Sequence, residues 1–171
     1  ALSAAMMFAG FTVIPYITIY LQSNAGMLPE QVPWVYLLGG TATLLTARLF
    51  GRLTDRVGKV KMFKRLAVAV ALPLMATTLS AGLPLAGLLL ISTAFFTMMS
   101  GRMIPGMALI SSAVEPRLRG TFMTLNSAVQ SASMGLAALV AGLIIGRDGQ
   151  GQLTFYWVAG LLGVCASLLS A

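Results

Sequence analysis

The sequence has no histidine, one cysteine and few charged residues, and each shortage excludes a class of function. Without histidine, the chain has neither histidine metal ligands nor a histidine proton relay. Its single cysteine, Cys165, cannot form a disulfide within the chain. Only 9% of the residues are charged and 58% are hydrophobic, whereas soluble domains are about 25% charged. This composition predicts a protein whose solvent is a lipid bilayer.

The residues that enzymes use are also missing as a group. Neither a histidine–aspartate set, nor a serine beside a base, nor a cluster of metal ligands is found in the apolar segments. The sequence therefore predicts a protein that is not an enzyme, with no cofactor and no metal site.

The net charge of +7 is concentrated beside apolar segments, which argues against nucleic acid as a partner. Most of the cations fall between two hydrophobic stretches, and such a cluster is an orientation signal in a membrane protein. Its members are Arg48, Arg52, Arg56, Lys59, Lys61, Lys64 and Arg65.

Six segments are apolar and long enough to cross a bilayer, which takes about 20 residues. We therefore expect an all-α integral membrane protein, a six-helix bundle forming one domain over residues 1–171. Short connections make consecutive helices antiparallel neighbours. The expected spans are residues 4–22, 29–50, 62–81, 85–114, 117–145 and 153–171.

The basic connections predict the orientation. Arg117 and Arg119 lie between the fourth and fifth spans, on the same side as the larger cluster if all six spans are present. The Lys/Arg bias places this side in the cytoplasm, which predicts a multi-pass protein of the inner (plasma) membrane. The chain starts at Ala1 and ends in an apolar run, so we expect a fragment of a longer protein.

Residues 51–61 read GRLTDRVGKVK between the second and third spans. This stretch resembles the signature loop of the major facilitator superfamily, G-x-L-x-D-R-x-G-x-x-K/R, at the place where that family carries it. The resemblance implies half of a twelve-helix carrier built from 3+3 inverted repeats.

A second similarity concerns the type of carrier. Residues 10–16 and the run from Arg102 to Asn126 look like the seventh, tenth and eleventh helices of arabinose-efflux-permease and drug-antiporter proteins. The resemblance implies the C-terminal half, a missing six-helix half as partner, and a proton as coupling ion. Since no acid lies at mid-membrane depth, the coupling carboxylate is expected in the other half.

The signature loop has a physical interpretation of its own. Gly51 is expected to allow close helix approach, and Gly58 to take the positive φ of a tight turn. Asp55, a lone acid among cations, is suited to a neighbouring helix N-terminus. The loop is then a conformational latch on the cytoplasmic side, formed by Gly51, Asp55, Arg56, Gly58, Lys59 and Lys61. A solvated loop that carries only a topology signal is the alternative.

Arg102 lies inside the fourth apolar span, about seventeen residues past its start. A charge in hydrocarbon usually faces a cavity or a partner. Arg102 is therefore a candidate substrate or gating contact, and an arginine that snorkels to the cytoplasmic headgroups is the alternative.

Four further polar residues are candidates for a substrate cavity. Asn126 and Gln130 share one stripe of the fifth span, and hydrogen bonding between helices is the alternative for both. Tyr16 and Tyr20 share a face of the first span, with an interfacial anchor as the alternative for Tyr20. Gly142 and Gly146 form a GxxxG pair, which predicts helix packing or, alternatively, a homodimer surface.

The function that these observations favour is a secondary transporter. We expect it to export small organic molecules, such as drugs or sugars, by alternating access. A stand-alone six-helix assembly or channel acting as a homodimer is the alternative.

Overall fold

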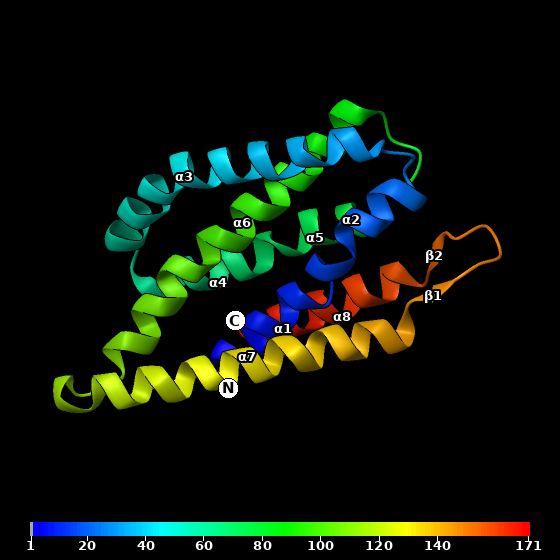
Figure 1. Cartoon of the computed structure of the whole chain (residues 1–171). Helices are drawn as coiled ribbons and strands as arrows, with labels where there is room; N and C mark the ends of the chain where they lie inside the picture. Colours follow the sequence, from blue (N-terminus) through cyan, green and yellow to red (C-terminus); the bar gives the residue numbers. More distant parts are fainter. Residues whose placement is uncertain (1) are drawn as a thin grey trace.

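A computed structural model describes residues 2–171, which form eight α-helices and one short β-hairpin (Figure 1). Two 3₁₀ turns, Pro29–Gln31 and Pro116–Leu118, precede the third and seventh helices. The elements are α1 (Leu2–Phe11), α2 (Ile14–Ser23), α3 (Val32–Val57), α4 (Lys59–Ala69), α5 (Ala71–Thr78), α6 (Leu85–Ser112), α7 (Arg119–Ile144), β1 (Gly146–Arg147), β2 (Leu153–Thr154) and α8 (Tyr156–Leu169).

Prolines explain why two of the expected spans are broken in the structure. A proline ring clashes with the carbonyl four residues before it and removes one helical hydrogen bond. Four residues before Pro15 is Phe11, the last residue of α1, and four residues before Pro73 is Ala69, the last residue of α4. Pro105, in contrast, lies within a continuous α6. The first and third expected spans are thus each a pair of short helices.

The signature segment is helical rather than a loop, which corrects our expectation. α3 continues to Val57 and α4 begins at Lys59, so the turn between them is Gly58 alone. Gly58 has φ +93°, a conformation that glycine takes without steric cost, as predicted.

Close approach between helices occurs at glycines other than Gly51. Among the described residues outside the helix's own backbone, none lies within 4 Å of where a Cβ would stand at Gly51, so no close helix approach is seen there. A Cβ at Gly101 would lie 2.6 Å from the Phe50 ring, and one at Gly39 would lie 2.9 Å from the Phe96 ring. These two glycines let α3 and α6 pack against each other.

The polar connection after α7 forms the β-hairpin. Gly146 pairs with Thr154 in its antiparallel register, and Asp148 accepts hydrogen bonds from two backbone amides in the turn. Since α7 ends at Ile144, Gly146 is not helical, so of the predicted GxxxG pair only Gly142 lies at a helix contact. α8 begins at Tyr156, three residues later than the expected start of the sixth span.

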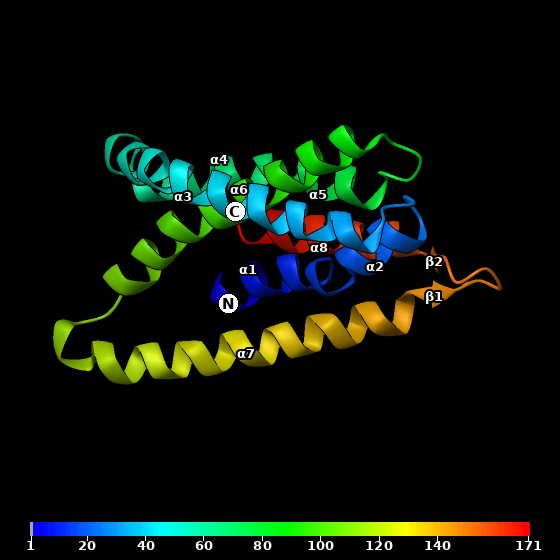
Figure 2. The ribbon, with the colours of Figure 1, turned by 45° about the horizontal axis from the view of Figure 1, so that its top comes forward.

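The helices lie roughly along one direction, with α7 at one edge and α3 at the other (Figures 1 and 2). The turn between α3 and α4 and the turn between α6 and α7 lie at the same end of the molecule (Figure 1). The hairpin and the α2–α3 and α5–α6 connections lie at the opposite end. The two basic connections are therefore on one side of the fold.

The largest core cluster lies where α2, α5, α6 and α8 meet. Phe95, Leu74, Ile17 and Tyr156 are almost completely buried there. The rings of Tyr20 and Tyr156 stack at 4.5 Å between centroids. This core fixes the position of α2 beside α8.

Three helical stretches among the described residues are long and apolar enough to cross a membrane: Leu2–Ser23, Leu85–Ser112 and Pro116–Ile144. α8 is apolar but shorter. α3 carries Arg48, Arg52, Asp55 and Arg56 in its second half, and the helices α4 and α5 are each short. The membrane character is thus clear, whereas the six-span count stays a prediction.

Candidate functional site

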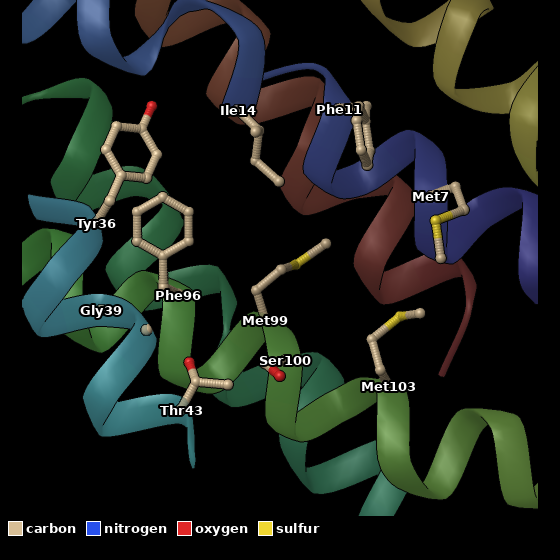
Figure 3. A pocket seen from close by; sticks show the side chains of 11 residues that line it. Met7, Phe11, Ile14, Tyr36, Gly39, Thr43, Phe96, Met99, Ser100 and Met103 are labelled. Carbon is tan, nitrogen blue, oxygen red and sulfur yellow. The ribbon is translucent and has the colours of Figure 1, made fainter. Parts of the chain in front are cut away.

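A pocket of about 420 Å³ lies between α1, the start of α2, α3 and α6 (Figure 3). In this article it is called the α1–α3–α6 pocket. Figure 3 shows the side chains of α1 and α2 on one side and those of α3 and α6 on the other. The lining residues are Met7, Phe11, Ile14, Tyr36, Gly39, Gly40, Thr43, Phe96, Met99, Ser100 and Met103.

The pocket lining is mainly apolar and flexible. Met7, Met99 and Met103 present thioethers, which adapt to ligands of different shape (Figure 3). Tyr36 and Phe96 supply aromatic faces, with ring centroids 5.8 Å apart. No charged side chain lines the pocket. It therefore offers dispersion and aromatic contact to a ligand rather than ion pairing.

Few polar groups in the pocket remain for a ligand. The Tyr36 hydroxyl shares a hydrogen bond of 2.6 Å with Thr18. Thr43 and Ser100 are the other two hydroxyl side chains in the lining. Such sparse polar groups can orient a ligand, but they cannot replace the hydration of a polyhydroxylated one.

Arg102 lies behind this pocket, in the interior of the bundle. Its side chain has no exposed surface, and it donates hydrogen bonds to Ser167 Oγ on α8 at 2.6 Å and to the Met6 carbonyl on α1 at 2.9 Å. The same guanidinium nitrogen that reaches Met6 lies 3.5 Å from Met99 Sδ. Arg102 does not line the pocket, but it contacts a residue that does.

The arginine connects four helices. Ser167 accepts from Arg102 and donates to the Ala67 carbonyl on α4 at 2.8 Å, so α6, α8 and α4 form one chain of hydrogen bonds. The bond to Met6 adds α1. Arg102 Nε has no partner within the described residues. A buried cation usually needs more hydrogen-bond partners than this to compensate for its lost hydration. Burying the Arg102 side chain therefore costs free energy.

The two tyrosines of α2 contact other helices. Tyr16 donates a hydrogen bond to the Ala138 carbonyl on α7 at 3.0 Å. Its hydroxyl lies 2.6 Å from where a Cβ would stand at Gly142, so this glycine provides the space for Tyr16. Tyr20 is buried against Tyr156, and its hydroxyl accepts from the Ala81 amide at 3.2 Å. Neither tyrosine lines the α1–α3–α6 pocket.

Asn126 and Gln130 of α7 are apart from the α1–α3–α6 pocket as well. Asn126 is 7% exposed and lines a smaller cavity of about 220 Å³ with Leu2, Phe122 and Ile110 among its neighbours. Gln130 is half-buried, with its amide nitrogen 3.9 Å from Met107 Sδ. The structure thus does not bring the predicted cavity residues together in one pocket.

The signature residues form a group at one end of the fold. Asp55, Arg56, Lys59 and Lys61 are all exposed around the Gly58 turn. α4 has Gly58 as its N-cap residue and no side-chain cap hydrogen bond, so Asp55 does not cap α4.

The pocket residues were missed because apolar residues in a membrane protein carry little signal. Phe96, Met99 and Met103 recur at spacings of three and four on α6, and the pair Gly39–Gly40 with Thr43 gives α3 a small-residue face. Both patterns are equally typical of helices that pack in lipid.

Comparison with known proteins identified one family. A model described as Major Facilitator Superfamily matches residues 1–171, the entire sequence. No curated protein and no solved structure matched the chain.

Proposed function

The chain belongs to the Major Facilitator Superfamily, whose members are membrane transporters of small molecules, and we propose that it forms the C-terminal six-helix half of a twelve-helix carrier. The absent half would then complete the carrier as its partner. The signature segment between α3 and α4, at the position corresponding to a second-to-third span connection, supports this proposal.

The α1–α3–α6 pocket is proposed as this half's share of the substrate site. Its volume of about 420 Å³ falls within the range of small-molecule sites, about 300–1,000 Å³. It lies beside the break between α1 and α2, and discontinuous helices often form the sites of secondary transporters. The single observation that carries the proposal is this pocket between three helices.

The chemistry of the pocket favours an apolar organic substrate over a sugar. A sugar would need a hydrogen-bonding partner for each hydroxyl that it buries. The pocket offers only Thr43, Ser100 and Tyr36, and Tyr36 is already hydrogen-bonded to Thr18. Three methionines and two aromatic rings suit a lipophilic molecule of variable shape.

Export by alternating access, driven by protons, completes the proposed mechanism. The four acids of the chain are Glu30, Asp55, Glu115 and Asp148, and none lies inside an apolar stretch. A titrating carboxylate within the membrane would therefore belong to the other half. The helix breaks before Pro15 and Pro73 are positions at which segments can tilt relative to one another.

We propose that the signature residues form a latch on the cytoplasmic side of the membrane. This position also defines the proposed orientation of the protein. The basic turn at Gly58 would face the cytoplasm of the inner (plasma) membrane, as the Lys/Arg bias predicts. Asp55 does not cap α4, which leaves its carboxylate available to a helix N-terminus of the other half.

Filling the pocket tests the substrate site. No atom lies within 4 Å of where a Cβ would stand at Gly40, so Gly40→Phe can place its ring in the pocket without a backbone clash. We expect Gly40→Phe in the full-length protein to lower efflux of a lipophilic dye at least tenfold. The matched control, Gly40→Ala, should leave efflux within twofold of the unmodified protein.

The outcome distinguishes the alternatives. Unchanged dye efflux by a Gly40→Phe protein that reaches the membrane at normal levels would contradict the pocket assignment. Efflux of a radiolabelled sugar but not of the dye would contradict the substrate class. A specific homodimer of the natural product, with no second six-helix half in its polypeptide, would favour the stand-alone assembly instead.

A further inference from the structure

A second cavity lies on the other face of the α3–α6 pair, and nothing in the proposed transport mechanism uses it. This α3–α6 groove has a volume of about 670 Å³. Its lining is apolar apart from three threonine side chains. The lining residues are Leu38, Thr41, Ala42 and Leu45 of α3, and Ala86, Leu89, Leu90, Thr93, Ala94, Thr97 and Met98 of α6.

The groove and the α1–α3–α6 pocket use opposite faces of α3. At 100° per residue, Leu38, Thr41 and Leu45 fall within about 60° of one another. Tyr36 and Thr43 of the pocket fall roughly 180° from Leu45 around the helix. A ligand in the groove would therefore not occupy the substrate pocket.

The groove is open to the surroundings of the protein. Leu45 is 74% exposed and Leu90 is 71% exposed, one from each helix. Because α6 is long and apolar enough to cross a membrane, lipid chains can reach the exposed Leu90, and they reach Leu45 as well if α3 also spans. A channel with two such walls suits one extended hydrocarbon chain.

An arginine stripe continues the groove toward the basic end. Arg48, Arg52 and Arg56 follow one another at steps of four residues along α3, so neighbouring Cβ atoms are about 6 Å apart. By the same helical geometry, Arg52 and Arg56 fall on the α3 face that carries Leu38 and Leu45. All three arginines are exposed.

The stripe keeps a positive charge after its acidic neighbour is counted. Asp55, three residues after Arg52, is the one acid between residues 48 and 65. Three arginines and one aspartate leave a net charge of about +2 on this part of α3. A phosphate group would find bidentate partners there, because guanidinium groups match its geometry.

The α3 wall of the groove and the arginine stripe together fit one membrane leaflet. Leu38 and Arg52 are fourteen residues apart, about 21 Å along the helix axis. Half of a bilayer with its headgroups measures roughly 20–22 Å. A lipid whose acyl chain ends near Leu38 would thus present its headgroup at the level of Arg48 and Arg52.

We propose that the outer face of α3 and α6 is a binding site for one anionic phospholipid. An acyl chain occupies the α3–α6 groove, and Arg48 and Arg52 bind the phosphate. The positive charge of the arginine stripe selects an anionic headgroup. Because the groove binds the acyl chain, the lipid occupies a defined site and is not merely attracted to a basic surface.

The test measures binding of two defined lipids to the purified full-length protein by native mass spectrometry. The probes are phosphatidylglycerol and phosphatidylcholine with the same acyl chains. We expect one phosphatidylglycerol to bind at least tenfold more tightly than phosphatidylcholine. Arg48→Gln with Arg52→Gln should weaken phosphatidylglycerol binding about 25-fold, at about fivefold for each cation removed. Phosphatidylcholine binding should fall by much less, because choline offsets the charge of its phosphate.

Two matched controls separate the site from total charge and from fold damage. Arg117→Gln with Arg119→Gln removes the same charge from the other basic connection and should leave phosphatidylglycerol binding within twofold. Arg48→Lys with Arg52→Lys keeps the charge but loses the bidentate geometry, so its phosphatidylglycerol binding should fall between that of the unmodified protein and that of the glutamine variant. Equal losses in the two glutamine double variants would overturn the proposal, because binding would then follow net charge alone.

Filling the groove tests the position of the acyl chain. Ala94→Trp should weaken binding of both lipids, whereas Leu143→Trp, on the exposed face of α7, should change neither. Unchanged lipid binding by Ala94→Trp would overturn the groove as the chain site. Crosslinking of a cysteine at Ala94 to another protein segment in native membranes, with no lipid bound, would show a protein occupant and would also overturn the proposal.

Discussion

Arg102 on α6 donates a hydrogen bond of 2.6 Å to Ser167 Oγ on α8, and the two residues are the centre of a buried polar network. Ser167 donates in turn to the Ala67 carbonyl on α4. Because neither side chain has exposed surface, no water at the surface can replace either partner. The network therefore determines how α6, α8 and α4 are held together.

Ser167→Ala tests the strength of this network. The substitution leaves an Arg102 N–H without its acceptor and the Ala67 carbonyl without its donor. We expect the free energy of unfolding to fall by about 1–3 kcal/mol, the cost of leaving a buried hydrogen-bonding group without its partner. Fluorescence of Trp34 and Trp157 during unfolding in detergent gives the measurement.

Ser133→Ala is the control for this variant. Its hydroxyl bonds only to the Val129 carbonyl one turn back on the same helix, so its loss should change stability by no more than about 0.5 kcal/mol. Equal stability losses for the two serines would contradict the role of the buried network. A transport defect in Ser167→Ala with normal stability would instead assign the network to function.

Asn24 connects α2 to the hairpin through both backbone groups of one residue. Its amide nitrogen donates to the Leu153 carbonyl at 2.9 Å, and its Oδ1 accepts from the Leu153 amide at 2.8 Å. Asn24→Ala removes both bonds and should lower stability by about 1–2 kcal/mol. Hydrogen exchange at the Leu153 amide should become faster, and Gln150→Ala should leave that exchange unchanged.

Asp55→Asn tests the proposed latch. The substitution keeps the size of the side chain but removes the charge that would favour a helix N-terminus. We expect transport by the full-length protein to fall several-fold while membrane insertion stays normal. Arg56→Lys, which preserves the positive charge at position 56 of the same segment, is the comparison variant. Normal transport by Asp55→Asn would contradict the latch and leave only the topology signal.

The membrane orientation is tested by single-cysteine labelling in sealed vesicles. Lys59→Cys and Arg117→Cys, in a Cys165→Ala background, should both react with an impermeant reagent from the same side. The two basic turns lie at one end of the fold, so this result is expected if that end faces the cytoplasm (Figure 1). A cysteine at Gly149 in the hairpin should react from the opposite side. Labelling of positions 59 and 117 from opposite sides would contradict the proposed topology.

Local chemistry made part of the fold predictable. The positive φ of Gly58 and the short turn that it forms follow from the residue itself. The helix breaks were harder to predict from the sequence. Prolines break a helix at two positions, but α6 continues through Pro105. Packing between α6 and its neighbours distinguishes these cases, and such packing cannot be read from a proline alone.

The candidate site was not predictable in the same way. Tyr16, Tyr20 and Asn126 were chosen because polar groups in apolar spans often face a cavity, but these residues contact other helices or a separate small cavity. The substrate pocket is lined mainly by methionine and aromatic residues. Since packing faces and lipid-facing surfaces are also apolar in a membrane protein, periodicity does not separate them from a pocket.

The sequence by itself determined that the chain is a membrane protein with apolar helices, basic turns and a family signature, since composition and local spacing carry those properties. Only the tertiary structure decided which polar groups meet. The partners of Arg102 are 65 and 96 residues away along the chain. Contacts of that kind depend on how whole helices pack, and no local pattern records them.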